Sequence, residues 1–291
     1  MTPPSRWWRL PGAMALIVFA SMLVTRAEPQ RGSYQDLVQL FREFLAFERP
    51  PLKHGAPDYT AATVASRRLR LRPFQSRLVA IDPGAWPVEQ QVDHALAQAL
   101  MNGLDFNLRV LQPWARDPAF YQSLWTSQSD TPAHEGPTHH AVVELWTYGF
   151  PLSPADEAKL AAELRTIAPL LTQARLNLTG NARDLWITGT GTMAEQVVDL
   201  DVLEKRAPKA GAELKDALRA ARAATSEFVT WLERQVPSKN GPSGIGKEHY
   251  NWSLRNVHLV PLTWDDEVAI LKRELARAHA SLKLEEHRNR Q

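Results

Sequence analysis

The chain has 291 residues, enough for one or two domains that bury a core. An apolar fraction of 44% and a charged fraction of 23% are typical of globular proteins and argue against a disordered chain. Residues 1–27 contain three of the 34 basic residues and no acidic residue. The remaining residues therefore carry 31 basic and 32 acidic side chains, a net charge of −1. This balance predicts no nucleic-acid partner. The absence of cysteine excludes disulfides, thiolate metal sites and thiolate catalysis.

Residues 1–27 have the organisation of a secretory signal peptide. Arg6 and Arg9 provide a charged start, and a 12-residue apolar run, AMALIVFASMLV, occupies positions 13–24. This run is too short to cross a bilayer comfortably, since a spanning helix needs about 20 apolar residues. The sequence TRA at 25–27 resembles a small-x-small cleavage site. These features together predict a cleaved leader.

We therefore expect an exported protein, periplasmic or extracellular, with a helical domain over residues 28–291. No membrane span would remain after leader cleavage. An uncleaved anchor and a misassigned start codon are the alternatives to a leader. A lipoprotein anchor is excluded because the sequence has no cysteine to carry the lipid.

The first predicted helices lie between residues 33 and 73. Ser33 is placed to cap a helix that ends before Pro50, and the stretch PPLKHGAPD at 50–58 predicts a loop. A basic helix follows and should end before Pro73, because proline removes a backbone donor and clashes with the preceding turn. Such a charge run is typical of a solvated face. It consists of Arg67, Arg68, Arg70 and Arg72.

A longer helix is predicted from Pro87 onward. Its apolar residues follow one another at steps of four and then three, which favours a stripe that faces the core. The stripe consists of Val92, Leu96, Leu100, Leu104, Leu108 and Leu111. Asp117 and Pro118 start a short helix. Residues 126–151 are rich in Ser, Thr, Pro, Gly and His, as loops are.

The second half of the chain continues the helical pattern. Ser153 and Pro154 give a cap and a first-turn proline, and Pro169 should kink the helix that follows. Further helices are predicted over residues 184–204, 213–236 and 263–291. The last shows no terminating glycine or proline, which suggests truncation. Because no long alternating strand pattern occurs, we predict an all-α fold, a multi-helix array of long antiparallel helices.

The segment HEGPTHH at 134–140 resembles the zinc peptidase motif H-E-x-x-H. That motif places two histidines four apart on one helical face, with a glutamate beside the metal-bound water. Here His134 and His139 are five apart, and the intervening Gly-Pro pair would break the helix. We therefore favour a solvated loop. A loop-borne metal site of His134, His139 and His140 is the alternative.

The segment GIGKEHY at 244–250 is a second candidate, because glycines before a helix can present backbone amides to an anion. A phosphate loop needs wider glycine spacing and a Ser or Thr after the lysine, and both are missing. We favour a helix entry in which the glycines supply backbone freedom. If the chain forms part of an enzyme, Lys247–Tyr250 is the stretch that could line its substrate cleft. His258, between apolar neighbours, is interpreted as a satisfied core histidine. No catalytic, cofactor-binding or metal-binding residue is assigned.

Several segments, in a shared order, resemble the bacterial family called domain of unknown function 885. They are Arg77-Leu78 with Ile81-Asp82-Pro83, QVDHALAQALMNGLD at 91–105, RDPAFY at 116–121, ARLNL at 174–178, GIGKEHY at 244–250 and LRNVHLVPLT at 254–263. The resemblance covers residues 34–291 and is weakest over 126–152. It implies that this chain corresponds to the helical N-terminal half of longer members.

Members of that family carry an H-E-x-x-H helix in their C-terminal half. The resemblance therefore implies zinc-dependent peptidases of the helical zincin type. The motif does not occur in this chain, so zinc is implied for the full-length family and no cofactor for this chain. The resemblance further implies a peptide substrate for the full-length form and a C-terminal half that would complement this chain.

Three hypotheses follow. We expect the N-terminal helical portion of an exported zinc metallopeptidase-like protein, inactive by itself. A non-catalytic helical binding or scaffold protein is the alternative. An independent metal enzyme that uses the three loop histidines is the third.

Overall fold

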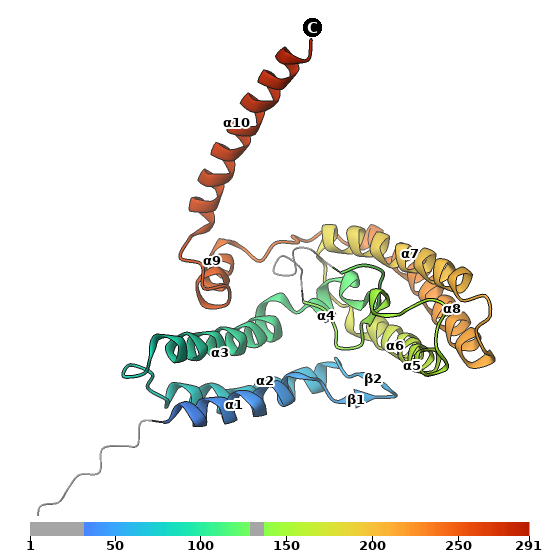
Figure 1. The fold of residues 1–291 in the computed structure, drawn as a ribbon, viewed down its shortest axis with the longest axis horizontal. Helices are drawn as coiled ribbons and strands as arrows, with labels where there is room; N and C mark the ends of the chain where they lie inside the picture. Colours follow the sequence, from blue (N-terminus) through green and yellow to red (C-terminus); the bar gives the residue numbers. More distant parts are fainter. Residues whose placement is uncertain (1–31, 129–136, 291) are drawn as a thin grey trace, which may run out of the picture. The chain divides into compact units, whose positions relative to one another are not determined.

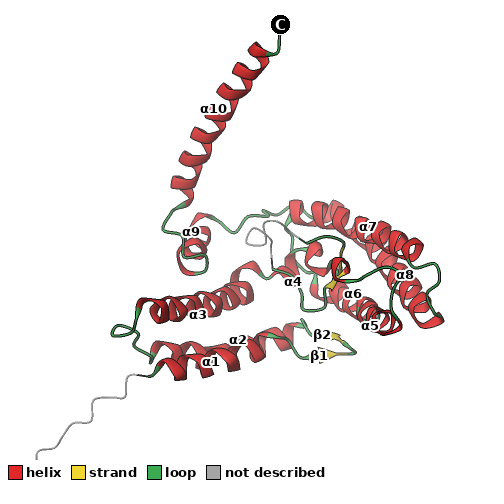
Figure 2. Cartoon of the chain, viewed as in Figure 1, coloured by secondary structure: helices red, strands yellow, loops and turns green. Residues whose placement is uncertain are grey.

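The computed structural model describes residues 32–128 and 137–290. Helices dominate this part of the chain, and the strands are two-residue segments (Figure 2). The all-α prediction is confirmed. The predicted leader at 1–27 lies outside the described residues and stays a prediction.

The helices and strands are labelled in Figure 1 where there is room. The α-helices are α1 (Tyr34–Glu48), α2 (Ala61–Val79), α3 (Val88–Phe106), α4 (Pro113–Arg116), α5 (Pro154–Leu164), α6 (Ile167–Asn177), α7 (Arg183–Arg206), α8 (Ala212–Gln235), α9 (Lys247–Asn256) and α10 (Trp264–Arg288). The shorter helices are the π-helical η1 (Asn107–Leu111) and the 3-10 turns η2 (Pro118–Tyr121), η4 (Leu145–Thr147) and η5 (Val236–Ser238). The strands are β1 (Leu52–Lys53), β2 (Ala56–Pro57), β3 (Leu124–Trp125) and β4 (Val143–Glu144).

Helix α1 begins where the sequence predicts. The Ser33 hydroxyl accepts the backbone N–H of Asp36, and the Asp36 carboxylate accepts the Ser33 N–H, which completes a capping box. The predicted loop after α1 contains a small antiparallel hairpin of β1 and β2. Its two-residue turn needs positive φ at both positions, and His54 and Gly55 have φ of 52° and 82°.

Helix α2 continues through Pro73, so the predicted end before this proline is wrong. The carbonyl that loses its helical partner belongs to Leu69, four residues earlier. Leu69 is 62% exposed, and Pro73 is exposed as well. Water can therefore satisfy the orphaned carbonyl, which makes the proline tolerable here.

The stripe predicted to face the core is exposed at its first three residues and buried at Leu108, which is 5% exposed. Val92, Leu96 and Leu100 are 49%, 48% and 46% exposed. The face that packs inward carries Ala97 and Met101, at 3% and 1%. The sequence periodicity was real, but no element within the described residues covers most of this face.

Helices α5 to α8 form a bundle around buried side chains. Helices α7 and α8 are consecutive and lie against each other (Figure 1). Helix α8 also contacts α5 and α6, and α7 contacts η2. Large side chains fill the space between them, including Trp186 and Phe228, both fully buried. The predicted kink appears as a break between α5 and α6, which places Pro169 in the first turn of α6, where its missing N–H costs little.

Buried Gln196 on α7 joins two parts of this core. Its Oε1 accepts the backbone N–H groups of Ser123 and Leu124, at 2.5 and 3.1 Å, and its Nε2 donates to the Thr225 hydroxyl on α8. A buried amide is stable only when its polar atoms are paired in this way. The side chain thus fixes the segment before β3 against the two longest helices of the bundle.

The glycines inside α7 do not interrupt it. A Cβ on Gly189 would lie 2.6 Å from the backbone nitrogen of Ala119, so only glycine permits η2 to approach α7 this closely. The sequence TGTG at 188–191 is expected to weaken a helix, but here it lies where α7 and η2 are in close contact.

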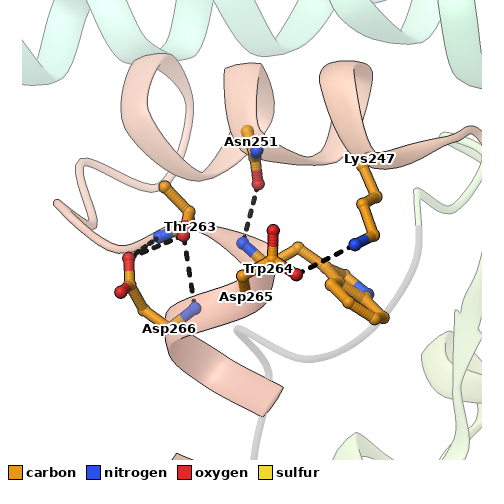
Figure 3. A network of polar contacts seen from close by, with 6 residues as sticks. All are labelled: Lys247, Asn251, Thr263, Trp264, Asp265 and Asp266. Atoms are coloured by element: carbon orange, nitrogen blue, oxygen red, sulfur yellow. Dashed lines mark hydrogen bonds and ion pairs between the residues drawn. The ribbon is translucent and has the colours of Figure 1, made fainter. Parts of the chain in front are cut away.

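Helices α9 and α10 meet at a polar junction (Figure 3). Thr263 and Asp266 form a capping box at the start of α10, and the Asn251 side-chain oxygen accepts the backbone N–H of Trp264 at 2.7 Å. Lys247 pairs with Asp265 at 2.9 Å. No residue of α10 between its bounds is buried. Within the described segments, no helix is long and apolar enough to cross a membrane.

Candidate functional site

His139 is a structural histidine and not a free metal ligand. It is 3% exposed, its Nδ1 accepts the backbone N–H of Ala141 at 3.0 Å, and its Nε2 lies 2.9 Å from the carbonyl oxygen of Gln122. The first bond requires an unprotonated Nδ1, so Nε2 carries the hydrogen and donates. Burial lowers the pKa of His139 to about 4. The imidazole is therefore neutral and has both nitrogens occupied.

This geometry weakens the hypothesis of an independent metal enzyme. His134 lies outside the described residues, and His140 is exposed at the surface. Within residues 32–128 and 137–290, no group of three or more acidic or histidine side chains is placed to hold a metal ion. The residues that the structure describes thus do not fit the zinc that the family resemblance implies.

The segment at 244–250 has the predicted form of a helix entry. Gly246 precedes α9 with φ of 82°, which a side chain would strain. Lys247 points back along the junction, where its ammonium group pairs with Asp265 and lies 3.8 Å from the ring centroid of Trp264 (Figure 3). The Tyr250 hydroxyl donates to Glu267 at 2.5 Å, and this bond raises the pKa of Tyr250. These residues hold α10 to α9.

The interpretation of His258 as a core histidine is wrong. The residue is exposed, in the turn that follows α9. The apolar neighbours that suggested a core position do not form a helix or strand, because the chain adopts positive φ at Leu259. These apolar residues therefore belong to the loop that connects α9 and α10, and not to a packed helix face.

An open apolar groove lies between α1 and α3. It has a volume of about 650 Å³, and its walls are mainly aliphatic and aromatic. The main apolar lining residues are Leu37, Val38, Phe41, Leu96, Leu100 and Leu104. At one rim the Tyr34 hydroxyl donates to Asp93 at 2.6 Å, which raises the pKa of Tyr34. The exposed face of α3 is one side of this groove.

The groove adjoins a second cavity of about 290 Å³, and Glu48, Leu104 and Asn107 line both. We call this smaller space the Arg67 cavity. Its apolar walls include Val64, Leu104, Leu108, Trp114 and Phe120. Its polar lining residues are Glu48, Tyr59, Arg67, Asn107, Thr138 and His140. It therefore combines a small apolar volume with several convergent polar groups, as ligand sites do.

Arg67 is the buried charge of this cavity. The residue is 7% exposed, and its Nη2 donates to the backbone carbonyl of Glu48 at 2.5 Å. Its guanidinium carbon lies 5.2 Å from the ring centroid of Phe47. No carboxylate among the described residues forms an ion pair with it. Burial lowers the pKa of Arg67, and within residues 32–128 and 137–290 its guanidinium donates one hydrogen bond, to the Glu48 carbonyl.

The other polar groups of the cavity are also shifted by burial. Burial raises the pKa of Glu48, although the charges of Arg67 and Arg49 oppose this effect. Burial also raises the pKa of Tyr59, whose hydroxyl accepts the backbone N–H of His140 at 3.1 Å. Perturbed groups gathered in one cavity mark a candidate functional site.

The prediction of a solvated face for the four arginines is correct for three of them and wrong for Arg67. A signal was present in the sequence. Arg67 lies four residues before Leu71 and eleven before Leu78, both buried, and so shares their helical face. The neighbouring arginines made the whole segment look solvent-exposed, so this periodicity was not used.

These features define an all-helical protein with an apolar groove, a buried arginine cavity and a helix, α10, without buried residues. The family model described as a bacterial protein of unknown function, DUF885, matches residues 46–286, and the chain belongs to this family. The predicted family resemblance is thereby confirmed at this level.

One solved structure is similar to the chain over most of its length. It is described as "a putative lipoprotein of unknown function from Shewanella oneidensis", with 15% sequence identity and a TM-score of 0.57. The match covers 85% of this chain and 46% of that one, so this chain spans less than half the length of that protein. At such identity the likeness supports the fold. No curated protein matches the chain in sequence.

Proposed function

We propose that this chain is the helical N-terminal portion of an exported zinc metallopeptidase-like protein. A C-terminal portion, which the chain does not contain, would bind the zinc and carry the catalytic groups on peptide substrates. The observation that carries the proposal is a pair of apolar faces, on α3 and α10, that no element of the described residues covers. The 46% coverage of the similar solved structure supports it, because a protein of similar fold has a further portion outside the matched region.

The apolar face of α10 has the spacing of a packing surface. Trp264, Val268, Leu271, Leu275, Ala278 and Leu282 recur at alternating steps of four and three. Such a stripe lies on one side of a helix and is normally covered by another helix. Leu271, Leu275 and Leu282 are 66%, 56% and 57% exposed. The helix is well capped, but no other element of the described residues covers these leucines.

Export is part of the proposal. The predicted leader supports it, and the Shewanella oneidensis protein of similar fold carries the description of a lipoprotein. This chain has no cysteine for a lipid anchor, so a cleaved leader is the route that we propose.

The chain's own residues would contribute binding surface and no catalytic step. The described residues offer no metal cluster, so zinc and the groups around it would come from the C-terminal portion. Zinc supplies a Lewis acid and an activated water in such peptidases. The groove between α1 and α3 is then a surface against which that portion packs.

The first test is to read the coding DNA beyond the codon for Gln291 in all three frames. We expect a helical segment with H-E-x-x-H, in frame or after a shift. Co-expression of that segment with this chain should then give a complex that binds zinc in stoichiometric amount and cleaves peptides. An open reading frame that stops without such a segment nearby contradicts the proposal and favours the non-catalytic helical binding protein.

A matched pair of variants tests the packing surface itself. Leu282→Glu places a charge on the α10 stripe and should abolish co-purification of the C-terminal segment. Leu284→Glu makes the same change at a residue of similar exposure, 59% against 57%, on the opposite side of the helix. It should leave the complex intact. Equal effects of the two variants would show that the stripe is not the contact.

A further inference from the structure

We propose that the Arg67 cavity binds a free α-amino acid with an apolar side chain. The ligand's carboxylate would pair with Arg67 and its ammonium group with Glu48, while its side chain lies against the apolar wall. This inference uses only residues of this chain and does not depend on the proposed peptidase role.

The charges of the cavity carry the first part of the argument. Arg67 and Glu48 have opposite charges, interact electrostatically and line the same space, yet they form no ion pair with each other. Among the residues that the structure describes, Arg67 has no carboxylate partner, and a buried guanidinium in this state is costly. A zwitterion can fill the gap between two such groups, because it presents a carboxylate to one and an ammonium group to the other.

The donors around Arg67 fit a carboxylate. One of the five N–H groups of the guanidinium is bound to the Glu48 carbonyl, and the planar fork suits a two-oxygen acceptor. The Tyr59 hydroxyl accepts a backbone N–H, so its own hydrogen can point to a ligand. The side-chain amide of Asn107 also lines the space and makes no hydrogen bond within the part of the chain that is described.

The remaining walls select an apolar side chain of modest size. Val64, Leu108, Trp114 and Phe120 surround a volume of about 290 Å³. This volume is at the lower limit for sites that hold drug-sized ligands. The shared lining residues Glu48 and Leu104 connect the cavity to the open groove, which gives a ligand a way in.

A purely structural role for Arg67 makes a different prediction. Its bond to the carbonyl of Glu48 caps the C-terminus of α1, and this role alone would stabilise the fold without creating a site for small molecules. A binding experiment with matched ligands separates the two.

The test is isothermal titration calorimetry of the full chain with L-leucine. We expect saturable binding with a dissociation constant below about 10 mM. Loss of either charged contact should raise this constant about tenfold or more. Leucinamide lacks the carboxylate and N-acetyl-leucine lacks the ammonium group, so each should bind at least about tenfold more weakly than leucine. Glycine, without the apolar side chain, should also bind more weakly.

The variants assign the two contacts. Arg67→Lys keeps the charge but loses the planar fork, and should weaken leucine binding by about tenfold. Glu48→Gln should weaken leucine and leave N-acetyl-leucine unchanged. Arg70→Lys is the matched control, because Arg70 also lies over the Phe47 ring, 5.5 Å from its centroid, but is exposed. This variant should bind leucine as tightly as the unchanged protein does.

Two results would overturn the proposal. One is the absence of saturable heat with leucine at about 10 mM, which corresponds to less than about 3 kcal/mol of binding free energy. The other is equal affinity for leucine, leucinamide and N-acetyl-leucine. If Arg67→Lys does not fold, the ligand series on the unchanged protein still decides the question. Neither result bears on the C-terminal portion, so the proposed function is tested separately.

Discussion

The α5–α8 bundle and helix α10 have similar sequence patterns and opposite environments. Helices α5 and α8 of the bundle, like α10, carry apolar residues at helical spacing and begin at capped or acidic first turns. In the bundle these apolar residues are buried, as Phe228 and Leu232 are on α8. On α10 no residue between Trp264 and Arg288 is buried.

This comparison shows what a hydrophobic period can and cannot predict. Periodicity identifies a helix and the face that will be covered, because apolar surface is driven out of water. It does not say which segment covers that face. The exposed leucines of α3 and α10 mark faces that no described element covers, and under the proposed function the C-terminal portion would cover them.

The largest expected effect contrasts the two regions directly. Phe228→Ala should lower the free energy of unfolding by about 4 kcal/mol, because it removes a fully buried ring from the bundle. Leu275→Ala on α10 should change it by less than about 0.5 kcal/mol. Urea denaturation of the two variants measures both values. A large loss in Leu275→Ala would mean that α10 packs against the bundle in solution.

The pH dependence of stability should depend on His139. The pKa of this residue is about 4 in the folded protein against 6.5 for a free histidine. Between pH 6.5 and 4 the imidazole is therefore protonated in the unfolded state and neutral in the folded state. Stability should thus fall by about 3 kcal/mol from pH 6.5 to 4 and stay flat above.

His139→Asn removes the titrating group and retains an acceptor for the N–H of Ala141. Urea melts between pH 4 and 7 should lose this part of the slope. His258→Asn, at an exposed histidine, is the control and should retain it. An unchanged slope in His139→Asn would show that the pH dependence has another source.

Gln196→Leu should cost about 2 kcal/mol, because it leaves the buried N–H groups of Ser123 and Leu124 without acceptors. Thermal unfolding followed by circular dichroism measures the loss. Gln39→Leu makes the same change on the exposed side of α1 and should be nearly neutral. Similar melting temperatures for both variants would contradict the role of Gln196 in the core.

The smallest expected effect concerns the α9–α10 junction. Lys247→Met removes an exposed ion pair with Asp265 and the contact with the Trp264 ring, together less than about 1 kcal/mol. Hydrogen exchange should speed up in the first turns of α10 and remain unchanged in α7. Faster exchange throughout the bundle would contradict a local role.

Much of the fold follows from the sequence. Ser33, Ser153 and Thr263 each cap a helix that begins one residue later, because a side-chain oxygen at these positions satisfies an otherwise unpaired N–H. The predictions that were wrong concern context beyond the helix itself. Pro73 was tolerated because Leu69 is exposed, and no local rule contains that information.

The candidate site was harder to predict. Arg67 belongs to a run of arginines that looks uniformly solvated, and its burial depends on Glu48 and Tyr59, which come from other elements. The spacing to Leu71 and Leu78 predicts which arginine faces inward but not what lines the cavity. Long-range contacts such as Tyr59 N–H to the Gln173 side chain, at 2.5 Å, have no signature in one sequence.

The polar junction at the start of α10 also has a mechanical consequence. A helix of 25 residues rises about 1.5 Å per residue, so Arg288 lies roughly 36 Å along the axis from Trp264. A pivot of about 10° at the junction would carry the far end sideways by roughly 6 Å. The helix therefore acts as a lever arm, in which Lys247, Tyr250 and Asn251 determine where a distant row of leucines is presented.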